Sequence, residues 1–289
     1  MSRVVCYTRR VIVDAHTHLF PPEIARDRDQ YVAADPTFGE LYGNPEAKLA
    51  SAEDLLRSMD AGGIDISVAL GFSWTDLDTC RRHNDYLLDG AVRSDGRLLP
   101  FPTLPLAAGL DAIEAEARRC AAAGALGFGE LRPDNLGFDL GGAGGDCLAS
   151  LAAELDAVLL FHVTEPAGHA YPGKHGLALE SFYAFVSAHP QVKVIGAHWA
   201  GGLPFYASMP EVRGLPSLYV DTAASSLLYD ASVYARVAGL TGAGTILFGS
   251  DYPLLSQARS RQRIEEAGLE AADRDRILGG NAAALLGFT

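Results

Sequence analysis

The sequence contains few cysteines, fewer basic than acidic residues and no long apolar run, and each shortage excludes a class of protein. Its four cysteines, Cys6, Cys80, Cys120 and Cys147, form no Cys-x-x-Cys pair, so we expect reduced thiols and no disulfide framework. No apolar run approaches the roughly 20 residues that a membrane-spanning helix needs. Lys and Arg total 23 against 36 Asp and Glu, and the net charge of −13 argues against nucleic acid or an anionic membrane as a partner.

The N-terminus also lacks the apolar segment that a secretory signal requires. Residues 1–10, MSRVVCYTRR, contain basic residues, but no apolar stretch follows them, so we expect no signal peptide. Together with the unpaired cysteines, this predicts a soluble cytoplasmic protein. The 289 residues are 48% hydrophobic and 20% charged, which is an ordinary globular composition. Because no linker or repeat interrupts them, we expect one catalytic domain over residues 1–289.

Eight short apolar runs recur along the chain, and segments with helical signals separate them. Most of these runs lack strict alternation, which is typical of strands buried on both faces of a parallel sheet. Eight such strands alternating with helices predict an α/β fold of the (β/α)8 TIM-barrel type. The candidate strands are residues 10–18, 65–70, 98–104, 125–131, 157–163, 192–199, 218–223 and 245–251.

Helix boundaries are marked at several places between these runs. Ser51 followed three residues later by Asp54 is typical of a helix start, and the glycines at 62–63 are typical of its end. Near the C-terminus, the glycines at 279–280 predict a break between two short helices. Two connections, 19–50 and 164–177, are long and show no clear regular structure. We expect them to be lid loops that shape a substrate site.

Imidazole and carboxylate side chains stand at the ends of five predicted strands. The active site of a TIM barrel lies at the carboxyl ends of its strands, so these side chains are expected to meet there. Two histidines on one strand are weak evidence alone, but six metal-type ligands at one rim predict a metal site. The candidate ligands are His16, His18, Glu130, His162, His198 and Asp251.

The ligand types indicate which ion suits such a site and what it does. Neutral imidazoles with carboxylates suit Zn²⁺ best, and Mn²⁺, Fe²⁺, Co²⁺ and Ni²⁺ are compatible. A catalytic zinc keeps one position for water and lowers the pKa of that water to about 7. Asp251 is placed to take the proton from such a water, and His198 is placed to hold the water or a second ion. Glu130 is placed to bridge two ions, so the sequence is compatible with one ion or two.

Each candidate ligand also has an interpretation without metal. Asp is a favoured helix N-cap, so Asp251 is also a candidate cap, and Glu130 is also placed to form an ion pair with Arg132. A single histidine such as His162 is more often a hydrogen-bonded core residue than a ligand. We expect Asp14 to support the site without binding metal. The histidines that lie outside the strand ends are expected at the surface: His83, His175 and His189.

The loop EPAGHAYPGKHG, residues 165–176, contains a partial phosphate-loop pattern. The spacing from Gly168 to Lys174 matches GxxxxGK, but His175 stands where a phosphate loop needs Ser or Thr. We therefore favour a lid that contacts an anionic group of a substrate over a nucleotide site, with an ordinary solvated loop as the alternative. The substrate-binding candidates are Arg132, His169 and Lys174, with Tyr171 also available.

Several motifs together resemble the amidohydrolase superfamily, in its amidohydrolase-2 branch with aminocarboxymuconate-semialdehyde decarboxylase. These motifs are DAHTH on the first strand, histidines ending the fifth and sixth strands, GSDYP ending the eighth, MDAGGID and ILGGNAAALLGF. The resemblance covers essentially the whole chain and implies a distorted barrel whose metal ligands are His16, His18, His162 and Asp251. It also implies that His198 activates water or serves a second ion. Glu130 departs from the carboxylated lysine of many binuclear members and is similar to the strand-four glutamate of TatD-type hydrolases.

The function expected first is a metal-dependent hydrolase that attacks a carbonyl-type carbon of a small amide, lactone or ester. The alternative is a nonoxidative decarboxylase of a small unsaturated or aromatic acid, which needs a cation such as Arg132 or Lys174 for the carboxylate. A TatD-like nuclease is disfavoured by the net acidity, and a non-catalytic metal scaffold is the least specific alternative. We expect a small-molecule substrate, and the resemblance is compatible with a homodimer.

Overall fold

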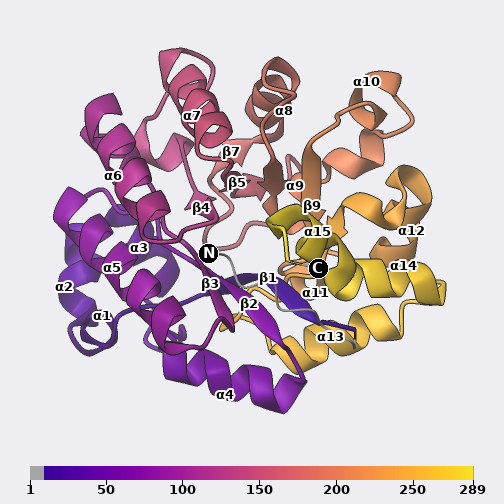
Figure 1. The fold of residues 1–289 in the computed structure, drawn as a ribbon, viewed down its shortest axis with the longest axis horizontal. Helices are drawn as coiled ribbons and strands as arrows, with labels where there is room; N and C mark the ends of the chain where they lie inside the picture. The colour runs from indigo at the N-terminus through magenta and orange to yellow at the C-terminus, as the bar shows by residue number, and fades with distance from the viewer. Residues whose placement is uncertain (1–9, 289) are drawn as a thin grey trace.

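The computed structural model describes residues 10–288, and parallel strands occupy its centre with helices arranged around them (Figure 1). Each of the eight predicted runs contains one of these strands, so the predicted α/β barrel is confirmed. The strands are β1 (Val13–His18), β2 (Ile66–Leu70), β3 (Leu98–Phe101), β4 (Gly127–Leu131), β5 (Val158–Phe161), β8 (Val194–Gly196), β9 (Leu218–Asp221) and β10 (Ile246–Leu247).

The barrel wall consists of two parallel sheets that meet at two seams. The strand order is β1-β2-β3 in one sheet and β10-β9-β8-β5-β4 in the other. At one seam, the amide of Ala15 donates to the carbonyl of Phe248 at 2.7 Å. At the other, the amide of Gly71 donates to the carbonyl of Gly129 at 2.9 Å. The seams close the barrel, although the short β10 leaves it distorted.

Alternate strand residues face the barrel interior and the surrounding helices. On β5, Val158 and Leu160 belong to the interior cluster, while Phe161 faces outward, with its ring 5.3 Å from that of Phe185. The interior cluster also includes Ala282 and Leu285 from the C-terminal helix, which lies over the centre of the strands (Figure 1). One end of the barrel is thus sealed by apolar packing, and chemistry is left to the other end.

The helices around the wall start and stop largely where the sequence indicates. Ser51 and Asp54 form a reciprocal capping box, and Gly63 ends that helix with a φ of 63°. The longer helices are α4 (Ala52–Gly62), α5 (Leu77–Arg93), α6 (Leu110–Ala122), α7 (Ala143–Glu154), α8 (Leu179–Ala188), α12 (Val233–Thr241) and α13 (Gln257–Glu265). The shorter ones are α9 (Ala197–Ala200), α10 (Pro210–Arg213), α11 (Ser225–Leu228), α14 (Ala271–Asp275) and α15 (Asn281–Leu286).

The connection 19–50 is largely helical, which corrects the expectation of a loop without regular structure. It contains α1 (Pro22–Arg26), α2 (Arg28–Ala34) and α3 (Pro36–Tyr42), which lie together beside the barrel (Figure 1). The ring of Phe38 packs 5.0 Å from that of Trp74 and 5.5 Å from that of Phe72. These helices are too short to be stable alone, so this aromatic packing supplies their stability.

The connection 164–177 remains mostly irregular. It runs between the short paired strands β6 (Val163–Thr164) and β7 (Leu177–Ala178), and residues 166–170 are exposed. Pairing of β6 with β7 brings the two ends of the loop together. The lid function of both connections stays a prediction.

The glycines near the C-terminus do not break the helix, which corrects a second expectation. A π-helical segment, Arg276–Gly280, joins α14 directly to α15. A Cβ atom on Gly279 would overlap the carbonyl oxygen of Val11, whereas Gly280 has room for one. Gly279 is therefore required for close approach of the helix to the chain before β1.

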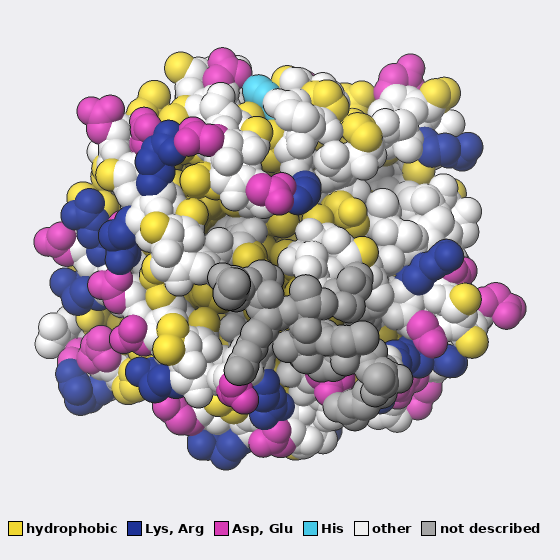
Figure 2. Space-filling model, in the orientation of Figure 1, with side chains coloured by type: hydrophobic (Ala, Val, Ile, Leu, Met, Phe, Trp, Pro, Cys, Tyr) yellow, Lys and Arg dark blue, Asp and Glu magenta, His cyan; other side chains and the backbone are white. Residues whose placement is uncertain are grey.

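The structure places the charged side chains of the surface and three of the four cysteines. In Figure 2, acidic and basic side chains are interspersed around the rim of the visible face. Between residues 10 and 288, no helix has both the length and the apolarity needed to cross a bilayer. Cys80, Cys120 and Cys147 are free thiols, and Cys6 lies outside the described residues. The cytoplasmic location and the homodimer stay predictions.

Candidate metal centre

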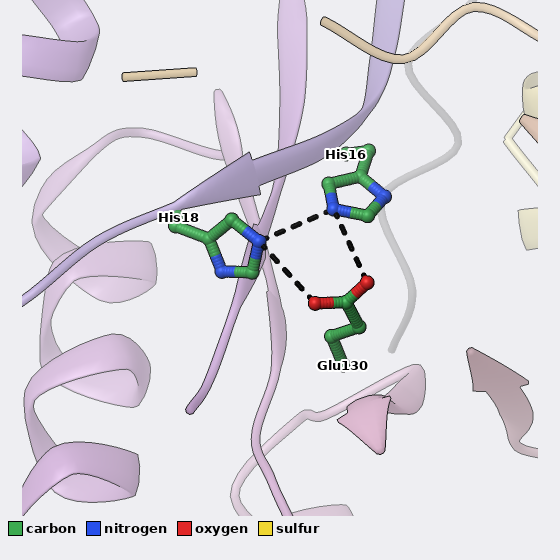
Figure 3. A group of neighbouring side chains, drawn as sticks. All are labelled: His16, His18 and Glu130. Atoms are coloured by element: carbon green, nitrogen blue, oxygen red, sulfur yellow. Dashed lines mark hydrogen bonds and ion pairs between the residues drawn. The ribbon is translucent and has the colours of Figure 1, made fainter. Parts of the chain in front are cut away.

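Six side chains predicted as ligands converge at the carboxyl ends of the strands. Nε2 of His16 and Nε2 of His18 lie 3.2 Å apart, and Oδ1 of Asp251 is 3.6 Å from each. Figure 3 shows both histidines extending from β1 toward the carboxylate of Glu130. Ligand atoms that surround one Zn²⁺ tetrahedrally at its usual bond lengths lie about 3.3 Å from one another. The spacing of this group therefore suits a small divalent ion.

Glu130 contacts a second group of ligand atoms as well as the first. Its Oε2 lies 3.7 Å from Nε2 of His18. Its Oε1 lies 2.8 Å from Nδ1 of His162 and 3.3 Å from Nε2 of His198. Nδ1 of His162 and Nε2 of His198 are 3.3 Å apart. Glu130 thus lies between His18 on one side and His162 with His198 on the other.

Hydrogen bonds behind the cluster orient three of its four imidazoles. Nδ1 of His16 contacts Oδ2 of Asp221 at 2.8 Å, and Nδ1 of His198 contacts the carbonyl of Ala223 at 3.3 Å. Nε2 of His162 contacts the carbonyl of Gly173 at 2.9 Å. Each acceptor holds a ring hydrogen on the outer nitrogen, so the inner nitrogen is the one whose lone pair would bind an ion when the ring is neutral.

Asp221 was missed as a site residue from the sequence, although a signal for it was present. It ends the seventh predicted strand and therefore lies at the same rim as the other acids. Its Oδ2 contacts His16, and its Oδ1 accepts the amides of His198 and Ala223 at 2.9 and 3.0 Å. One buried carboxylate therefore orients two residues of the cluster.

Asp14 supports the site without contacting the cluster atoms, as expected. Its Oδ1 accepts the amides of His16 and Ser250, and its Oδ2 accepts the side-chain amide of Gln257 at 2.8 Å. Burial raises the pKa of Asp14 to about 6 despite these hydrogen bonds. Asp14 therefore joins β1 to the segment after β10, where Asp251 lies.

His198 and Asp251 both occupy left-handed backbone conformations. Asp251 has a φ of 64°, and His198, Trp199 and Ala200 have φ values of 56°, 59° and 48°. A left-handed conformation costs roughly 1–2 kcal/mol for each residue that is not glycine. Nε1 of Trp199 donates to Oγ of Ser225 at 2.7 Å, which helps hold this turn. Asp251 is not a helix N-cap, because the next helix, α13, is capped by Ser256.

The charges of the cluster shift the pKa values of its histidines in opposite directions. Burial alone would lower the pKa of His16, but the Asp221 carboxylate, with Asp251 and Glu130, raises it to about 10. Burial and the charge of His16 lower the pKa of His18 to about 4. Burial opposes ionisation of His198, but its hydrogen bond to Glu130 raises its pKa to about 9. The metal-free cluster therefore combines protonated and neutral imidazoles at neutral pH.

Arg132 lies at the edge of the cluster with one side of its guanidinium unsatisfied. Its Nη2 is 3.0 Å from both ring nitrogens of His162, and its Nε is 4.0 Å from Oε2 of Glu130. The expected pairing of Arg132 with Glu130 therefore coexists with the contacts of Glu130 to the histidines. Nη1 of Arg132 is buried and has no hydrogen-bond partner among the described residues.

The other two predicted substrate residues lie away from the cluster. His169 is exposed in the loop 165–176. Nζ of Lys174 donates to the carbonyls of Ala167 and His169, each at 2.8 Å. The ammonium of Lys174 thus stabilises the loop itself, and the structure does not bring it to the cluster.

His83 is buried, which corrects its predicted surface position. Its Nδ1 accepts from Nε1 of Trp74 at 2.9 Å, and its Nε2 contacts the carbonyl of Leu19 at 2.6 Å. No local pattern indicates this pairing, because Leu19, Trp74 and His83 come from different segments. His175 is exposed as expected, and His189 is half-buried.

Three solved structures cover nearly the whole chain with similar folds. The 5-carboxyvanillate decarboxylase of Sphingomonas paucimobilis has a TM-score of 0.77 at 13% identity, over 97% of this chain and 100% of that one. The 2,6-dihydroxybenzoate decarboxylase of Rhizobium has a TM-score of 0.73 at 18% identity, over 96% and 99%. The 5-carboxyvanillate decarboxylase of Novosphingobium aromaticivorans, complexed with manganese and 4-hydroxy-3-methoxy-5-nitrobenzoic acid, has a TM-score of 0.78 at 17% identity, over 96% of each chain. A search of curated protein sequences finds no match.

These neighbours overturn the expectation of hydrolysis as the main activity. All three are decarboxylases, so the comparisons favour the alternative that the sequence offered. At identities below 25% the likeness itself establishes the fold, and the reaction of this chain must be argued from its own site. A divalent ion remains the supported cofactor, because the ligand cluster is complete and one neighbour contains manganese.

The sequence itself matches a family model over almost its entire length. The model describes an amidohydrolase and aligns with residues 13–288. This span begins at the first residue of β1 and includes all six residues of the cluster. The chain therefore belongs to the amidohydrolase family.

Proposed function

We propose that this protein is a metal-dependent, nonoxidative decarboxylase of a small unsaturated or aromatic acid. The observation that carries the proposal is the position of Arg132. Arg132 is 4% exposed, and its guanidinium lies against His162 and Glu130 and has an unsatisfied Nη1. A buried cation with a free donor favours an anionic ligand, because a carboxylate would complete its hydrogen bonds and offset its charge. A neutral amide or lactone could accept a hydrogen bond from that donor, but it would leave the buried charge of Arg132 without a counter-charge.

The residues of the cluster fit a divalent ion. His16, His18, Glu130, His162, His198 and Asp251 supply only imidazole and carboxylate groups, and the outer ring nitrogens of three histidines are fixed by acceptors. When bound, the ion would supply a Lewis acid that stabilises negative charge developing on the substrate. We propose Zn²⁺, since imidazole-rich sites suit it, with Mn²⁺ as the ion to compare.

Decarboxylation also needs a proton for the carbon atom that loses carbon dioxide. Arg132 would bind and orient the substrate carboxylate, which is the role for which its free Nη1 is suited. His198 and Asp251 are the groups that we propose to move the proton. Nε2 of His198 lies 3.3 Å from Oε1 of Glu130, so a proton shared by these two groups would stand directly at the cluster.

The proposal is tested by elemental analysis of the purified protein, followed by assays with hydroxylated benzoic acids. We expect divalent metal, with the number of ions per chain counted in the same measurement, and release of carbon dioxide from an acid substrate. His16→Ala and Asp251→Ala should lose metal and activity together. Turnover of esters or amides without carbon dioxide release would contradict the proposal.

The role of Arg132 in substrate binding is tested by comparing the KM values of two arginine variants. Arg132→Gln should raise KM for the acid by about tenfold or more while metal content is unchanged, because a charged hydrogen bond contributes roughly 1.5–3 kcal/mol. Arg118→Gln, which alters an exposed arginine on α6, is the matched control and should leave KM unchanged. Equal KM values for the two variants would remove Arg132 from substrate binding.

A further inference from the structure

The loop 165–176 places a backbone carbonyl directly behind one of the cluster histidines. Nε2 of His162 is 2.9 Å from the carbonyl oxygen of Gly173. A carbonyl oxygen only accepts hydrogen bonds, so it holds a ring hydrogen on Nε2. Nδ1 lies 2.8 Å from Oε1 of Glu130, which also only accepts, and 3.3 Å from Nε2 of His198. An ion at the cluster would replace the hydrogen on Nδ1, and the loop carbonyl would then stabilise the tautomer that keeps its hydrogen on Nε2.

Only glycine fits the position from which this carbonyl reaches His162. Gly173 has a φ of +84°, and a Cβ atom there would lie 2.6 Å from Cδ2 of Leu41 and 3.4 Å from Nη2 of Arg132. A Cβ atom at Gly176 would lie 2.6 Å from Cδ2 of His162. The loop backbone thus passes closely over the imidazole at two points, with no room for side chains.

The backbone of Gly173 is also held through its amide, by the helical segment after β1. Its amide donates to Oε1 of Glu40, on α3, at 2.9 Å. Glu40 is exposed, while Gly173 is buried. A chain of hydrogen bonds therefore runs from α3 through the loop to the metal cluster, and both of the long connections contribute to it.

The hydrogen-bond acceptor behind His162 lies in a different part of the fold from the acceptors behind His16 and His198. His16 is oriented by Asp221 on β9, and His198 by the carbonyl of Ala223 directly after that strand. Asp221 belongs to the barrel wall, and Ala223 lies two residues after it. The partner of His162 belongs to a surface loop whose residues 166–170 are exposed.

We propose that Gly173 and Glu40 are positioning residues of the metal centre: Glu40 holds Gly173 by its amide, and the carbonyl of Gly173 stabilises the tautomer of His162 that ligates metal. This rests on the proposed metal centre. Metal affinity and the loop conformation that contacts His162 are then coupled, and by linkage the bound ion stabilises this conformation to the same extent that the conformation stabilises ion binding. Groups behind metal-binding histidines typically change affinity by about 10- to 100-fold.

The test measures Mn²⁺ affinity of the full chain by chelator competition, together with hydrogen exchange of residues 165–176 with and without Mn²⁺. Gly173→Ala should weaken binding by about tenfold or more and remove the slowing of exchange by metal. Gly168→Ala is the matched control, because Gly168 lies in the same loop with a φ of +92° and its nearest neighbour is Nζ of Lys174 at 3.7 Å. Its affinity should stay within about twofold of the parent.

A second pair of variants keeps the test valid if Gly173→Ala fails to fold. Glu40→Ala should weaken Mn²⁺ binding by about three- to tenfold, whereas Glu40→Gln keeps an accepting oxygen and should bind nearly as the parent does. Glu46→Ala, which alters another exposed acid of the same connection, should have no effect. If Glu40→Ala and Glu46→Ala bind Mn²⁺ equally well and the parent binds it normally, this inference is wrong. The proposed function is not affected by that result. A parent protein that binds no divalent ion would overturn the proposed function itself.

Discussion

Asp221 and His16 are 205 positions apart in the chain, yet Oδ2 of Asp221 contacts Nδ1 of His16 at 2.8 Å. Both side chains are fully buried. The carboxylate fixes the hydrogen of His16 on Nδ1, and it raises the pKa of the imidazole against the effect of burial. Asp221 therefore controls a histidine of the metal centre without lying among its inner atoms.

Replacing Asp221 by Asn should weaken metal binding by about 10- to 100-fold while the fold is retained. The amide is nearly the same size but lacks the negative charge that orients His16. Chelator competition measures the change, and far-ultraviolet circular dichroism checks the fold. Asp156→Asn is a suitable control because that aspartate is exposed and pairs with Lys193. Unchanged affinity in Asp221→Asn would show that the Asp221–His16 pair is only structural.

Glu130 should be the main reason that His198 is protonated in the metal-free protein. The pKa of His198 lies near 9 because the hydrogen bond and charge of Glu130 overcome burial. Glu130→Gln removes the charge, so we expect the pKa of His198 to fall by at least about one unit. NMR titration of chelator-treated protein with labelled histidine follows this value directly. A pKa that stays near that of the parent would contradict the assignment of Glu130 as the cause.

Burial of His83 should make stability depend on pH below neutrality. Its pKa is lowered by burial from 6.5 to about 4, so between these values the unfolded chain binds a proton that the folded chain does not. The free energy of unfolding therefore falls as pH decreases through this window, and it is fully restored above it. Between about pH 7 and about pH 5 this one group contributes a loss of about 2 kcal/mol.

The contribution of His83 is isolated by comparison with His83→Gln. Glutamine can accept from Trp74 and donate to the carbonyl of Leu19, but it does not titrate. Urea unfolding of both proteins, with chelator present, should show a smaller loss of stability in the variant on acidification. Parallel pH profiles for the two proteins would show that His83 is not the group responsible.

Alanine substitutions at Gly279 and Gly280 should have opposite effects on stability. A methyl group at Gly279 would overlap the carbonyl oxygen of Val11, and we expect a destabilisation of about 2–4 kcal/mol. Gly280 lies in a helical conformation, and the nearest atom to a new methyl group would be at 3.5 Å, so Gly280→Ala should stabilise by about 0.5–1 kcal/mol. Thermal unfolding compares the two variants. A similar loss in both would contradict the close approach at Gly279.

The strands and the inner residues of the cluster were predictable because their signals are local. An apolar run followed by His or an acid is visible in the sequence, and the geometry of a barrel then brings the ends of β1, β4 and β5 together. The start of α4 was predictable for the same reason, since Ser51 and Asp54 lie three residues apart. Each of these predictions needed only short segments and one general rule of architecture.

The supporting contacts were not predictable because they depend on tertiary packing or on backbone atoms. The acceptor for His162 is a main-chain carbonyl, which has no sequence signature, and its position depends on how loop 165–176 folds. The helices of 19–50 are short, and they are stabilised by rings such as Phe38 and Trp74 from different segments. Gly279 was misinterpreted because a glycine needed for close approach looks the same in sequence as one that ends a helix.

The pairing of Asp14 with Ser250, 236 positions later, has a consequence for synthesis of the chain. His16 and His18 are synthesised first, and Asp251 follows only after more than 200 further residues have been added. At roughly 5–20 residues per second, this interval is on the order of tens of seconds. During that time β1 lacks the neighbour that closes the barrel, and its histidines lack the acid that completes their ligand set. The part of the metal site that includes Asp251 is therefore completed late in synthesis, after the group of Glu130, His162 and His198 has been made.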